Sequence, residues 1–169
     1  MRTVVISLAL AFVVSHSVLA QQPAAQNPGE VMKTLVSSAD VAALVAKAKS
    51  ERKEGQALIA QSLIRLAPYN VSLEYRSAVA NAAVHEREAE LFYVIDGSAT
   101  IVTGGKLADE KRTNAENLSG TGIAGGTSRR IAKGDFIMVP ENTPHWFSAI
   151  DGSITLMSLH LPRAATATR

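Results

Sequence analysis

The 169-residue sequence contains no cysteine, which excludes disulfide bonds and thiol chemistry. Stability must therefore come from a packed core, a bound metal or a partner subunit. The sequence also lacks an excess of either charge, because 17 basic and 15 acidic residues give a formal net charge of +2. Nucleic acids and anionic membrane surfaces are bound through clustered Lys and Arg. We therefore expect neither of them to be the main partner.

A membrane-spanning segment is missing as well, since such a helix needs about 20 apolar residues. The apolar run from Val4 to Val14 is shorter than this and follows the positive charge of Arg2. It leads to the small residue Ala20, as in a secretory signal peptide. The sequence thus predicts a signal peptide over residues 1–20, cleaved after Ala20. The mature protein is then exported, periplasmic or secreted, with no stable membrane anchor.

The remaining chain has room for one domain with a buried core, preceded by a helix. We expect a flexible leader over residues 21–36 and a helix over residues 37–55. Ser37 and Asp40 have the spacing of a capping box, and Gly55 marks the predicted end of the helix. Four apolar residues fall on one face at helical spacing, namely Val41, Leu44, Val45 and Ala48.

From residue 56 to residue 161 the sequence changes to short β-rich runs separated by turn residues. The expected strands are residues 58–66, 71–76, 91–95, 99–102, 130–132, 136–139, 145–149 and 154–161. Asp96-Gly97 predicts a hairpin turn between the third and fourth of these strands. Residues 104–128, with six glycines, predict either a flexible surface loop or a loop over a site. Strands without intervening helices indicate an antiparallel sandwich or barrel, followed by a frayed tail over residues 162–169.

Histidine is scarce, because only three remain once His16 leaves with the signal peptide: His85, His145 and His160. His85 and His145 stand in turn-rich segments, and Glu90 follows His85. Imidazole and carboxylate groups together bind Fe, Mn, Zn, Ni or Co, and two histidines with one carboxylate leave positions open for substrate or dioxygen. Opposing strands of a barrel bring such distant segments together. We therefore predict a divalent metal site of His85, Glu90 and His145, and we interpret His160 as structural or exposed.

These two segments resemble the two short motifs of the cupin superfamily of small β-barrels. In the first motif, His-x-His is followed after three or four residues by Glu, and after six more by Gly. Glu90 and Gly97 have that spacing, and His85 matches the second histidine. The second motif reads Gly, five residues, Pro-x-Gly, two residues, His, and it matches the segment Gly134 to His145. Asn142 replaces the middle glycine, which is a mild change because Asn tolerates the left-handed backbone of a turn.

The resemblance covers residues 56–161 and implies an all-β fold. That fold is an antiparallel double-stranded β-helix, or jelly-roll barrel, to which this chain adds its N-terminal α-helix. It also implies a divalent metal (Fe, Mn, Zn or Ni), a small-molecule substrate or ligand, and a homodimer. Arg87 or Arg65 would pair with a substrate anion. Tyr75 and Phe147 would line the pocket, and Phe147 shares strand parity with His145.

The resemblance has one gap, because Ala83 occupies the position of the first motif histidine. In the alternative register His85 is that first histidine and Arg87 replaces the second, so one histidine is missing either way. Three possibilities stay open: a three-ligand site, a fourth ligand recruited from elsewhere in the chain, or a barrel that has lost its metal. Glu88 is a spare carboxylate, but only Glu90 has the motif's distance to Gly97.

Two kinds of function follow from these possibilities. With its metal, the barrel is expected to be an enzyme of the oxygenase or of the lyase and isomerase type, acting on a small organic substrate. Without full metal chemistry, it is expected to be a non-catalytic barrel that binds a small molecule. A structural or dimerisation role is a third option. The fold is shared by many unrelated reactions, so the sequence does not identify the substrate.

Overall fold

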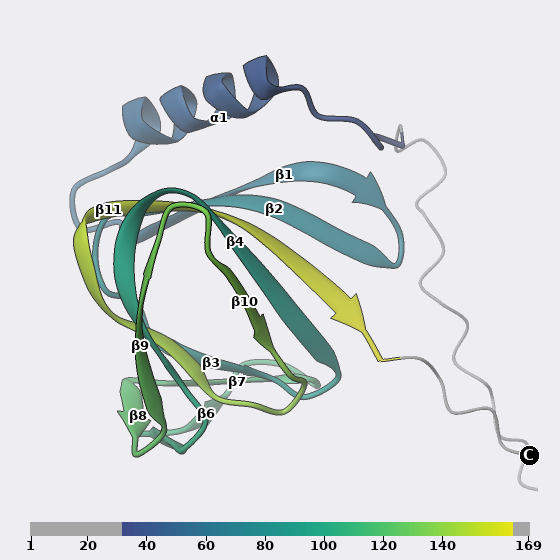
Figure 1. The fold of residues 1–169 in the computed structure, drawn as a ribbon. Helices are drawn as coiled ribbons and strands as arrows, with labels where there is room; N and C mark the ends of the chain where they lie inside the picture. The colour runs from purple at the N-terminus through teal and green to yellow at the C-terminus, as the bar shows by residue number, and fades with distance from the viewer. Residues whose placement is uncertain (1–31, 164–169) are drawn as a thin grey trace, which may run out of the picture.

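The computed structural model describes residues 32–163, so the predicted signal peptide, most of the leader and most of the tail lie outside the described residues. Helix α1 (Ser38–Glu51) lies across one side of a β-barrel (Figure 1). The strands are β1 (Leu58–Leu66), β2 (Tyr69–Arg76), β3 (Ala82–His85), β4 (Glu88–Thr103), β5 (Lys106–Ala108), β6 (Lys111–Arg112), β7 (Asn117–Gly120), β8 (Gly122–Ala124), β9 (Thr127–Ala132), β10 (Phe136–Val139) and β11 (His145–Pro162).

Helix α1 begins at the predicted capping box. The Ser37 hydroxyl accepts a hydrogen bond from Asp40 N at 3.1 Å, and the Asp40 carboxylate accepts one from Ser37 N at 2.9 Å. The helix ends at Glu51, four residues before Gly55, which was its predicted end. Its apolar residues Val41, Leu44 and Val45 pack on a small core of Leu63, Val71 and Leu73 from β1 and β2. This contact covers the outer face of those two strands.

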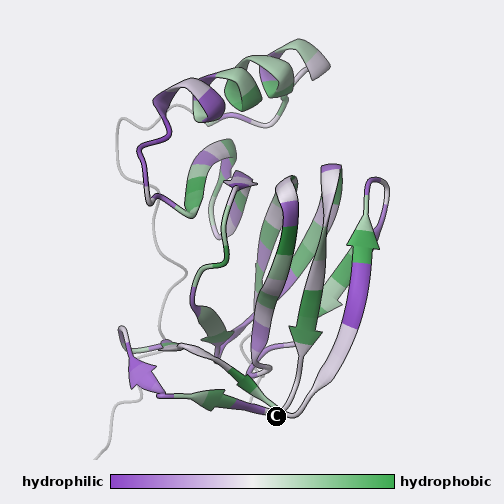
Figure 2. Ribbon diagram, turned by 90° about the vertical axis from the view of Figure 1, so that its left-hand side faces the viewer, coloured by the Kyte–Doolittle hydropathy of each residue, from purple (hydrophilic) through white to green (hydrophobic). Residues whose placement is uncertain are grey.

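The barrel is held together by its two longest strands, β4 and β11, which pair with each other along most of their length. The main sheet runs in the order β1-β2-β11-β3-β7-β6, and β4 also pairs with β9 and β10. All these pairs are antiparallel, so the predicted antiparallel barrel is confirmed. Hydrophobic and hydrophilic residues alternate along several strands (Figure 2). The inward-facing set forms the main core, with Phe92, Val94, Ala99, Ile101, Ile131, Val139, Phe147, Ile154 and Leu156.

The predicted hairpin turn at Asp96-Gly97 is wrong. Strand β4 continues through both residues, and its two halves pair with β11 rather than with each other. Gly97 has a φ of +83°, and a Cβ there would overlap the carbonyl oxygen of Ser153 on β11. Glycine is therefore needed for the close approach of two strands, and not for a reversal of the chain. Likewise, the two strands predicted over residues 145–161 form the single strand β11.

The segment 104–128 is more ordered than the predicted loop. It contains β5, β6, β7 and β8, which lie together at one end of the barrel (Figure 1). Strand β7 pairs with β3 and so extends the main sheet, while β5 and β8 form a separate two-stranded sheet. Because β7 pairs with β3, this segment borders the strand that contains His85.

Candidate metal centre

Three strands bring the predicted ligands to one end of the barrel interior. His85 is the last residue of β3, Glu90 lies near the start of β4, and His145 is the first residue of β11. His145 pairs with Ala83, two residues before His85 on the same face of β3. Asn142 N donates a hydrogen bond to His85 O at 2.7 Å, with Asn142 in the predicted left-handed conformation at φ 55°. The two motif segments are thus joined directly through the backbone.

The centre of the cluster is the buried carboxylate of Glu90, whose residue is 2% exposed. Its Oε2 atom lies 3.1 Å from His145 Nε2 and 3.4 Å from His85 Nε2. The other oxygen, Oε1, accepts a hydrogen bond from the Ser158 hydroxyl at 2.5 Å. Among the described residues, no group donates a hydrogen bond to Oε2 in acceptable geometry. Burying a charged oxygen without a hydrogen-bond donor costs free energy. A cation, or a proton on a facing imidazole nitrogen, would offset the charge of Oε2.

A third histidine joins this cluster, although the sequence offered no motif for it. His160, near the end of β11, pairs with Glu90 in the strand register. Its Nε2 atom lies 3.3 Å from Glu90 Oε1, and its ring centroid lies 4.7 Å from that of His85. Its side chain is 15% exposed. His160 is therefore not exposed, and it contacts the central carboxylate.

The outer nitrogen of His85 is held by an amide oxygen. His85 Nδ1 lies 2.6 Å from Asn117 Oδ1, on the neighbouring strand β7. The orientation of that amide is defined because Asn117 Nδ2 donates to Asn114 Oδ1 at 3.0 Å. An amide oxygen only accepts hydrogen bonds, so Nδ1 of His85 carries the hydrogen. The lone pair of Nε2 is then directed to Glu90.

The other two histidines have the same arrangement. His145 Nδ1 lies 3.3 Å from the backbone oxygen of Thr143, and His160 Nδ1 lies 2.9 Å from Glu88 Oε2. Both partners are acceptors, so both Nδ1 atoms carry hydrogen. Metal-binding histidines commonly donate their second ring N–H to such a carbonyl or carboxylate.

The charges of the cluster are strongly coupled. Burial favours a neutral Glu90, but the facing imidazoles of His145, His160 and His85 outweigh it and hold the pKa of Glu90 far below its usual range. Burial alone would lower the pKa of His160, but Glu90 and Glu88 outweigh it and raise that pKa to about 9. Burial alone would also lower the pKa of His85, but hydrogen bonds with Glu90 and Asn117 outweigh it and raise that pKa. Without a metal, Glu90 is therefore charged and His160 is protonated at neutral pH.

The donor set fits a divalent metal ion. Ligand atoms of His85, Glu90 and His145 all lie within 4.8 Å of one another, and the same holds for His85, Glu88 and His160. Imidazole nitrogens with carboxylate oxygens suit Fe, Mn, Zn, Ni or Co and do not select among them. The donor-free Oε2 of Glu90 is the oxygen that such an ion would contact.

Comparison with known proteins agrees with this architecture. Residues 56–165 match the family model described as Cupin. This chain belongs to the cupin family. Similar solved structures include a cupin superfamily protein from Desulfitobacterium hafniense DCB-2, with 16% identity over 66% of this chain and 83% of that chain and a TM-score of 0.47. The structure of KdgF from Halomonas sp. has 18% identity over 66% and 86% of the two chains, with a TM-score of 0.48.

A third solved structure, that of FeII HppE, has 17% identity over 65% of this chain and 53% of that chain, with a TM-score of 0.49. No curated protein matches the sequence.

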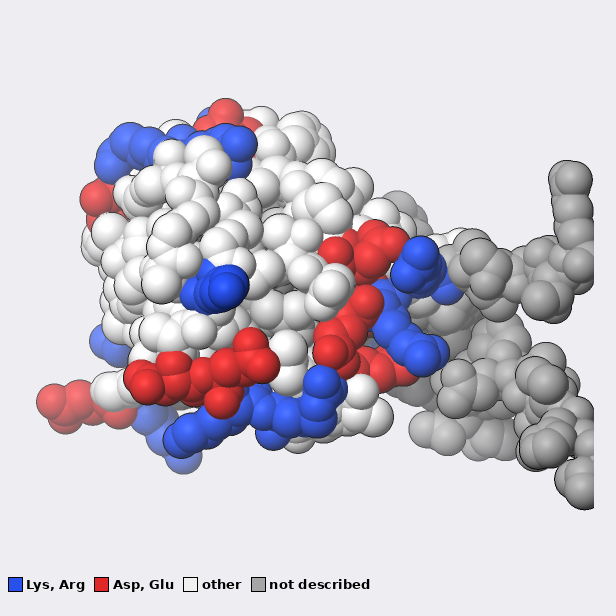
Figure 3. All heavy atoms as spheres, turned by 90° about the horizontal axis from the view of Figure 1, so that it is seen from below, with Lys and Arg blue, Asp and Glu red and all other residues white. Residues whose placement is uncertain are grey.

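In the described part of the cupin, no helix is long and apolar enough to cross a membrane. On the face seen from the side of β6, β7 and β8, Lys and Arg lie beside Asp and Glu (Figure 3).

Of the residues predicted to bind substrate, Phe147 is joined to the histidine cluster through Phe92. Phe147 is 2% exposed, and its ring packs edge-on against Phe92, which in turn contacts His145 with ring centroids 6.0 Å apart. Tyr75 faces α1, where Lys49 Nζ lies 5.9 Å from its ring centroid. Arg87 has a 65% exposed side chain whose Nε lies 3.8 Å from Glu116 Oε1.

One guanidinium on the inner side of this cupin barrel is that of Arg76, which the sequence did not point to. Arg76 stacks on the Phe147 ring at 4.4 Å from its centroid and pairs with Glu74 Oε2 at 2.7 Å. The contacts of α1 explain this position: Val71, Leu73 and Tyr75 face the helix, so strand alternation places Glu74 and Arg76 on the inner face. The sequence shows the alternation but not which of the two faces the helix covers. Arg65, the other arginine considered, lies on β1, where its backbone pairs with Lys33.

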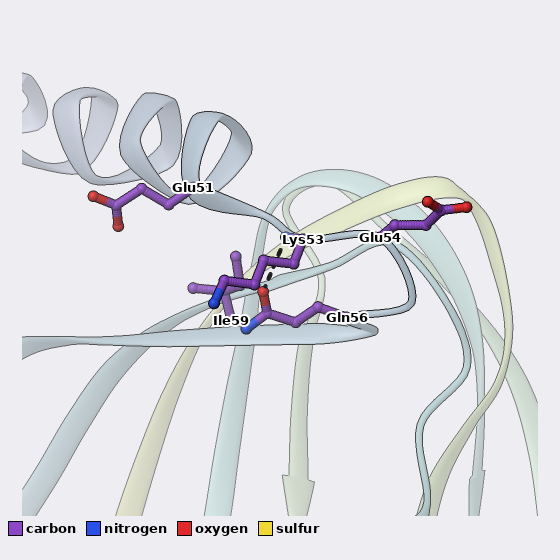
Figure 4. Close-up of a pocket in the computed structure, with 5 residues that line it drawn as sticks. All are labelled: Glu51, Lys53, Glu54, Gln56 and Ile59. Carbon is purple, nitrogen blue, oxygen red and sulfur yellow. Dashed lines mark hydrogen bonds between the residues drawn. The ribbon is translucent and has the colours of Figure 1, made fainter.

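A surface hollow lies away from this cluster, between the end of α1 and the start of β1 (Figure 4). It is lined by Glu51, Lys53, Glu54, Gln56 and Ile59. The backbone N–H of Lys53 donates to Gln56 Oε1 at 3.2 Å across it. The hollow is open, its charges are of both signs, and it shares no residue with the histidine cluster.

Proposed function

We propose that this cupin is a metal-dependent enzyme that acts on a small organic substrate, as an oxygenase or as a lyase or isomerase. The observation that supports it is the buried Oε2 of Glu90, which lies between two imidazole nitrogens without a hydrogen-bond donor. A purely structural carboxylate at this depth would be expected to have donors on both oxygens. The signal-peptide pattern of residues 1–20 supports the further proposal that the enzyme is exported.

In this proposal His85, Glu90 and His145 hold the ion. A divalent ion in that position would act as a Lewis acid toward a substrate oxygen, or would bind dioxygen beside the substrate if it is iron. Ser158 holds the carboxylate of Glu90 in place through its hydroxyl. Phe92 and Phe147 close the inner side of the cluster and exclude water from it.

Substrate approaches from the less buried side of the cluster. The side chain of His85 is 20% exposed, whereas that of His145 is 6% exposed. The cluster therefore opens on the side of His85 and is closed behind His145 by Phe92. A small substrate that coordinates through oxygen is consistent with this restricted opening.

A second candidate function, capture of a small molecule without catalysis, is favoured by one observation. Ala83 lies opposite His145 at the position of the first motif histidine, and its methyl group provides no ligand. A cupin that lost that ligand together with its metal would keep the barrel and its pocket. In that case the protons between the histidines and Glu90 would be the permanent state of the cluster.

Metal content distinguishes the two candidates. The mature protein, purified without chelators and analysed for metals by mass spectrometry, is expected to contain about one divalent ion per chain. His145→Ala and Glu90→Ala should lose it, whereas Ser148→Ala, a polar residue of β11 outside the cluster, should retain it. A folded wild type that takes up no Fe, Mn, Zn, Ni or Co on reconstitution would reject the enzyme proposal. Dioxygen uptake with iron restored then separates an oxygenase from a lyase or isomerase.

A further inference from the structure

The position of His160 suggests how the gap at Ala83 is filled. We propose that His160 is the fourth metal ligand, so that a single ion is held by His85, Glu90, His145 and His160. The ligand that the family motif places on β3 would thus come from the far end of β11. This inference rests on the proposed metal site and defines its ligand set.

The first argument is the approach of His160 to the central carboxylate. His160 Nε2 lies 3.3 Å from Glu90 Oε1, about as close as His85 Nε2 lies to Oε2, at 3.4 Å. His85 lies beside both other histidines, with ring centroids 5.3 Å from His145 and 4.7 Å from His160. The three Nε2 atoms therefore face the same carboxylate, those of His85 and His145 at Oε2 and that of His160 at Oε1.

The second argument is the orientation of the ring. Glu88 Oε2 accepts the hydrogen bond of His160 Nδ1 at 2.9 Å, which leaves Nε2 as the nitrogen with a free lone pair when the ring is neutral. This carboxylate–histidine arrangement fixes the tautomer of metal ligands and raises their basicity. Glu88 thus has a role as an outer partner, and it need not replace Glu90 as a ligand.

The third argument concerns the number of ions. The two possible ligand triads share His85, so two separate ions would both need a nitrogen of that ring. His85 Nδ1 is already bonded to Asn117 Oδ1 at 2.6 Å, which leaves only Nε2. One lone pair binds one ion, so the two triads cannot be occupied by separate ions at the same time.

The competing explanation is that His160 only forms an ion triad with Glu88 and Glu90. A buried ion pair is weak evidence for a stabilising role, because removing the charges from water offsets most of their attraction. That explanation concerns Oε1 of Glu90 and does not account for Oε2, which His85 and His145 face. A shared metal ion accounts for both carboxylate oxygens and all three rings.

Pulsed EPR with Cu(II) as the probe tests the ligand set, because it counts the imidazoles bound to the ion. We expect the wild-type mature protein to bind one Cu(II) with three imidazoles. His160→Ala should show two, and added free imidazole should restore the third by occupying the empty position. The affinity of His160→Ala for Zn(II) should fall about 100-fold or more, beyond the usual loss of an outer partner. Leu161→Ala, the adjacent residue of β11, should keep three imidazoles and the wild-type affinity.

Three results would overturn the inference. The first is a wild type that binds one ion through only two imidazoles, with the same count in His160→Ala; the proposed metal function would then survive. The second is the binding of two ions per chain. The third, a wild type that binds no ion, would reject the proposed function as well. If His160→Ala does not fold, the wild-type count still decides between two and three imidazoles.

Discussion

Raising the pH should destabilise the metal-free protein, because its cluster is held together by protons. The pKa of His160 is raised from 6.5 to about 9 in the folded state. A raised pKa means that protonation favours folding, so this stabilisation is complete below pH 6.5 and disappears as the pH rises through 9. Glu90 acts in the other direction and at lower pH, because its lowered pKa stabilises the fold above its usual value of 4.5. It therefore adds no slope in the same interval.

The magnitude follows from the shift. One pKa unit corresponds to about 1.4 kcal/mol, so a shift from 6.5 to about 9 amounts to about 3 kcal/mol in the free energy of unfolding. The side chain of His160 is only 15% exposed, so solvent screens the interaction weakly. His85, whose pKa is also raised, adds to the loss in the same direction.

The measurement is urea unfolding of the EDTA-treated protein at pH 6.5, 7.5 and 9, followed by the fluorescence of Trp146. We expect the free energy of unfolding of the wild type to fall by about 3 kcal/mol more than that of His160→Gln, which keeps polarity but does not titrate. Equal pH slopes for the two proteins would refute the reasoning. Metal-loaded protein should show the opposite trend, because metal binding displaces these protons and strengthens as the pH rises.

Three further predictions concern the fold and the gap in the motif. Gly97→Ala should lower the free energy of unfolding by about 2 kcal/mol or more, because β4 and β11 cannot approach each other with a Cβ at this position, where φ is +83°. Gly55→Ala is the matched control, because Gly55 also has a positive φ but a Cβ there meets no atom within 4 Å. Phe92→Ala should cost about 3–5 kcal/mol through its cavity, and a loss below about 1 kcal/mol would contradict the core assignment. Adding Ala83→His to His160→Ala should restore Zn(II) affinity measured by calorimetry, and an unchanged affinity would show that the two positions are not equivalent.

Local features of the fold were predictable where neighbouring residues determine them. The strand predicted over residues 58–66 coincides with β1, and the capping box at Ser37 and Asp40 is present. Both depend on contacts within a few residues. The hairpin at Asp96-Gly97 was wrong because a turn dipeptide is also compatible with a bend in a continuous strand. Only the partner strand β11 distinguishes the two, and that partner is distant in sequence.

The order within residues 104–128 was missed for a related reason. Apart from the buried Gly120, the residues of β6 and β7 are exposed or half-buried, and the two strands pair with each other and with β3. Short polar strands of this kind have little alternation to detect. Missing β7 also meant missing a residue of the site, because Asn117 on β7 orients His85 and no sequence motif pointed to it.

The failure to assign His160 to the cluster has a physical cause in the register of β11. His145 and His160 are 15 residues apart in sequence, so strict alternation would place their side chains on opposite faces of a strand. The structure has register shifts between Phe147 and Ala149, between Ile150 and Ile154, and between Thr155 and Leu156. The buried positions change accordingly, from 145 and 147 at the start of the strand to 154, 156 and 158 further on, with Thr155 also buried at the last register shift.

The same switch occurs in β4, whose buried positions are 90, 92 and 94 before Gly97 and 99 and 101 after it. The two strands change face together because they pair across this bend. A bulge that preserves pairing leaves almost no trace in composition, since each half of the strand still alternates. The irregularity in the middle of β11 therefore turns a third imidazole, that of His160, toward Glu90.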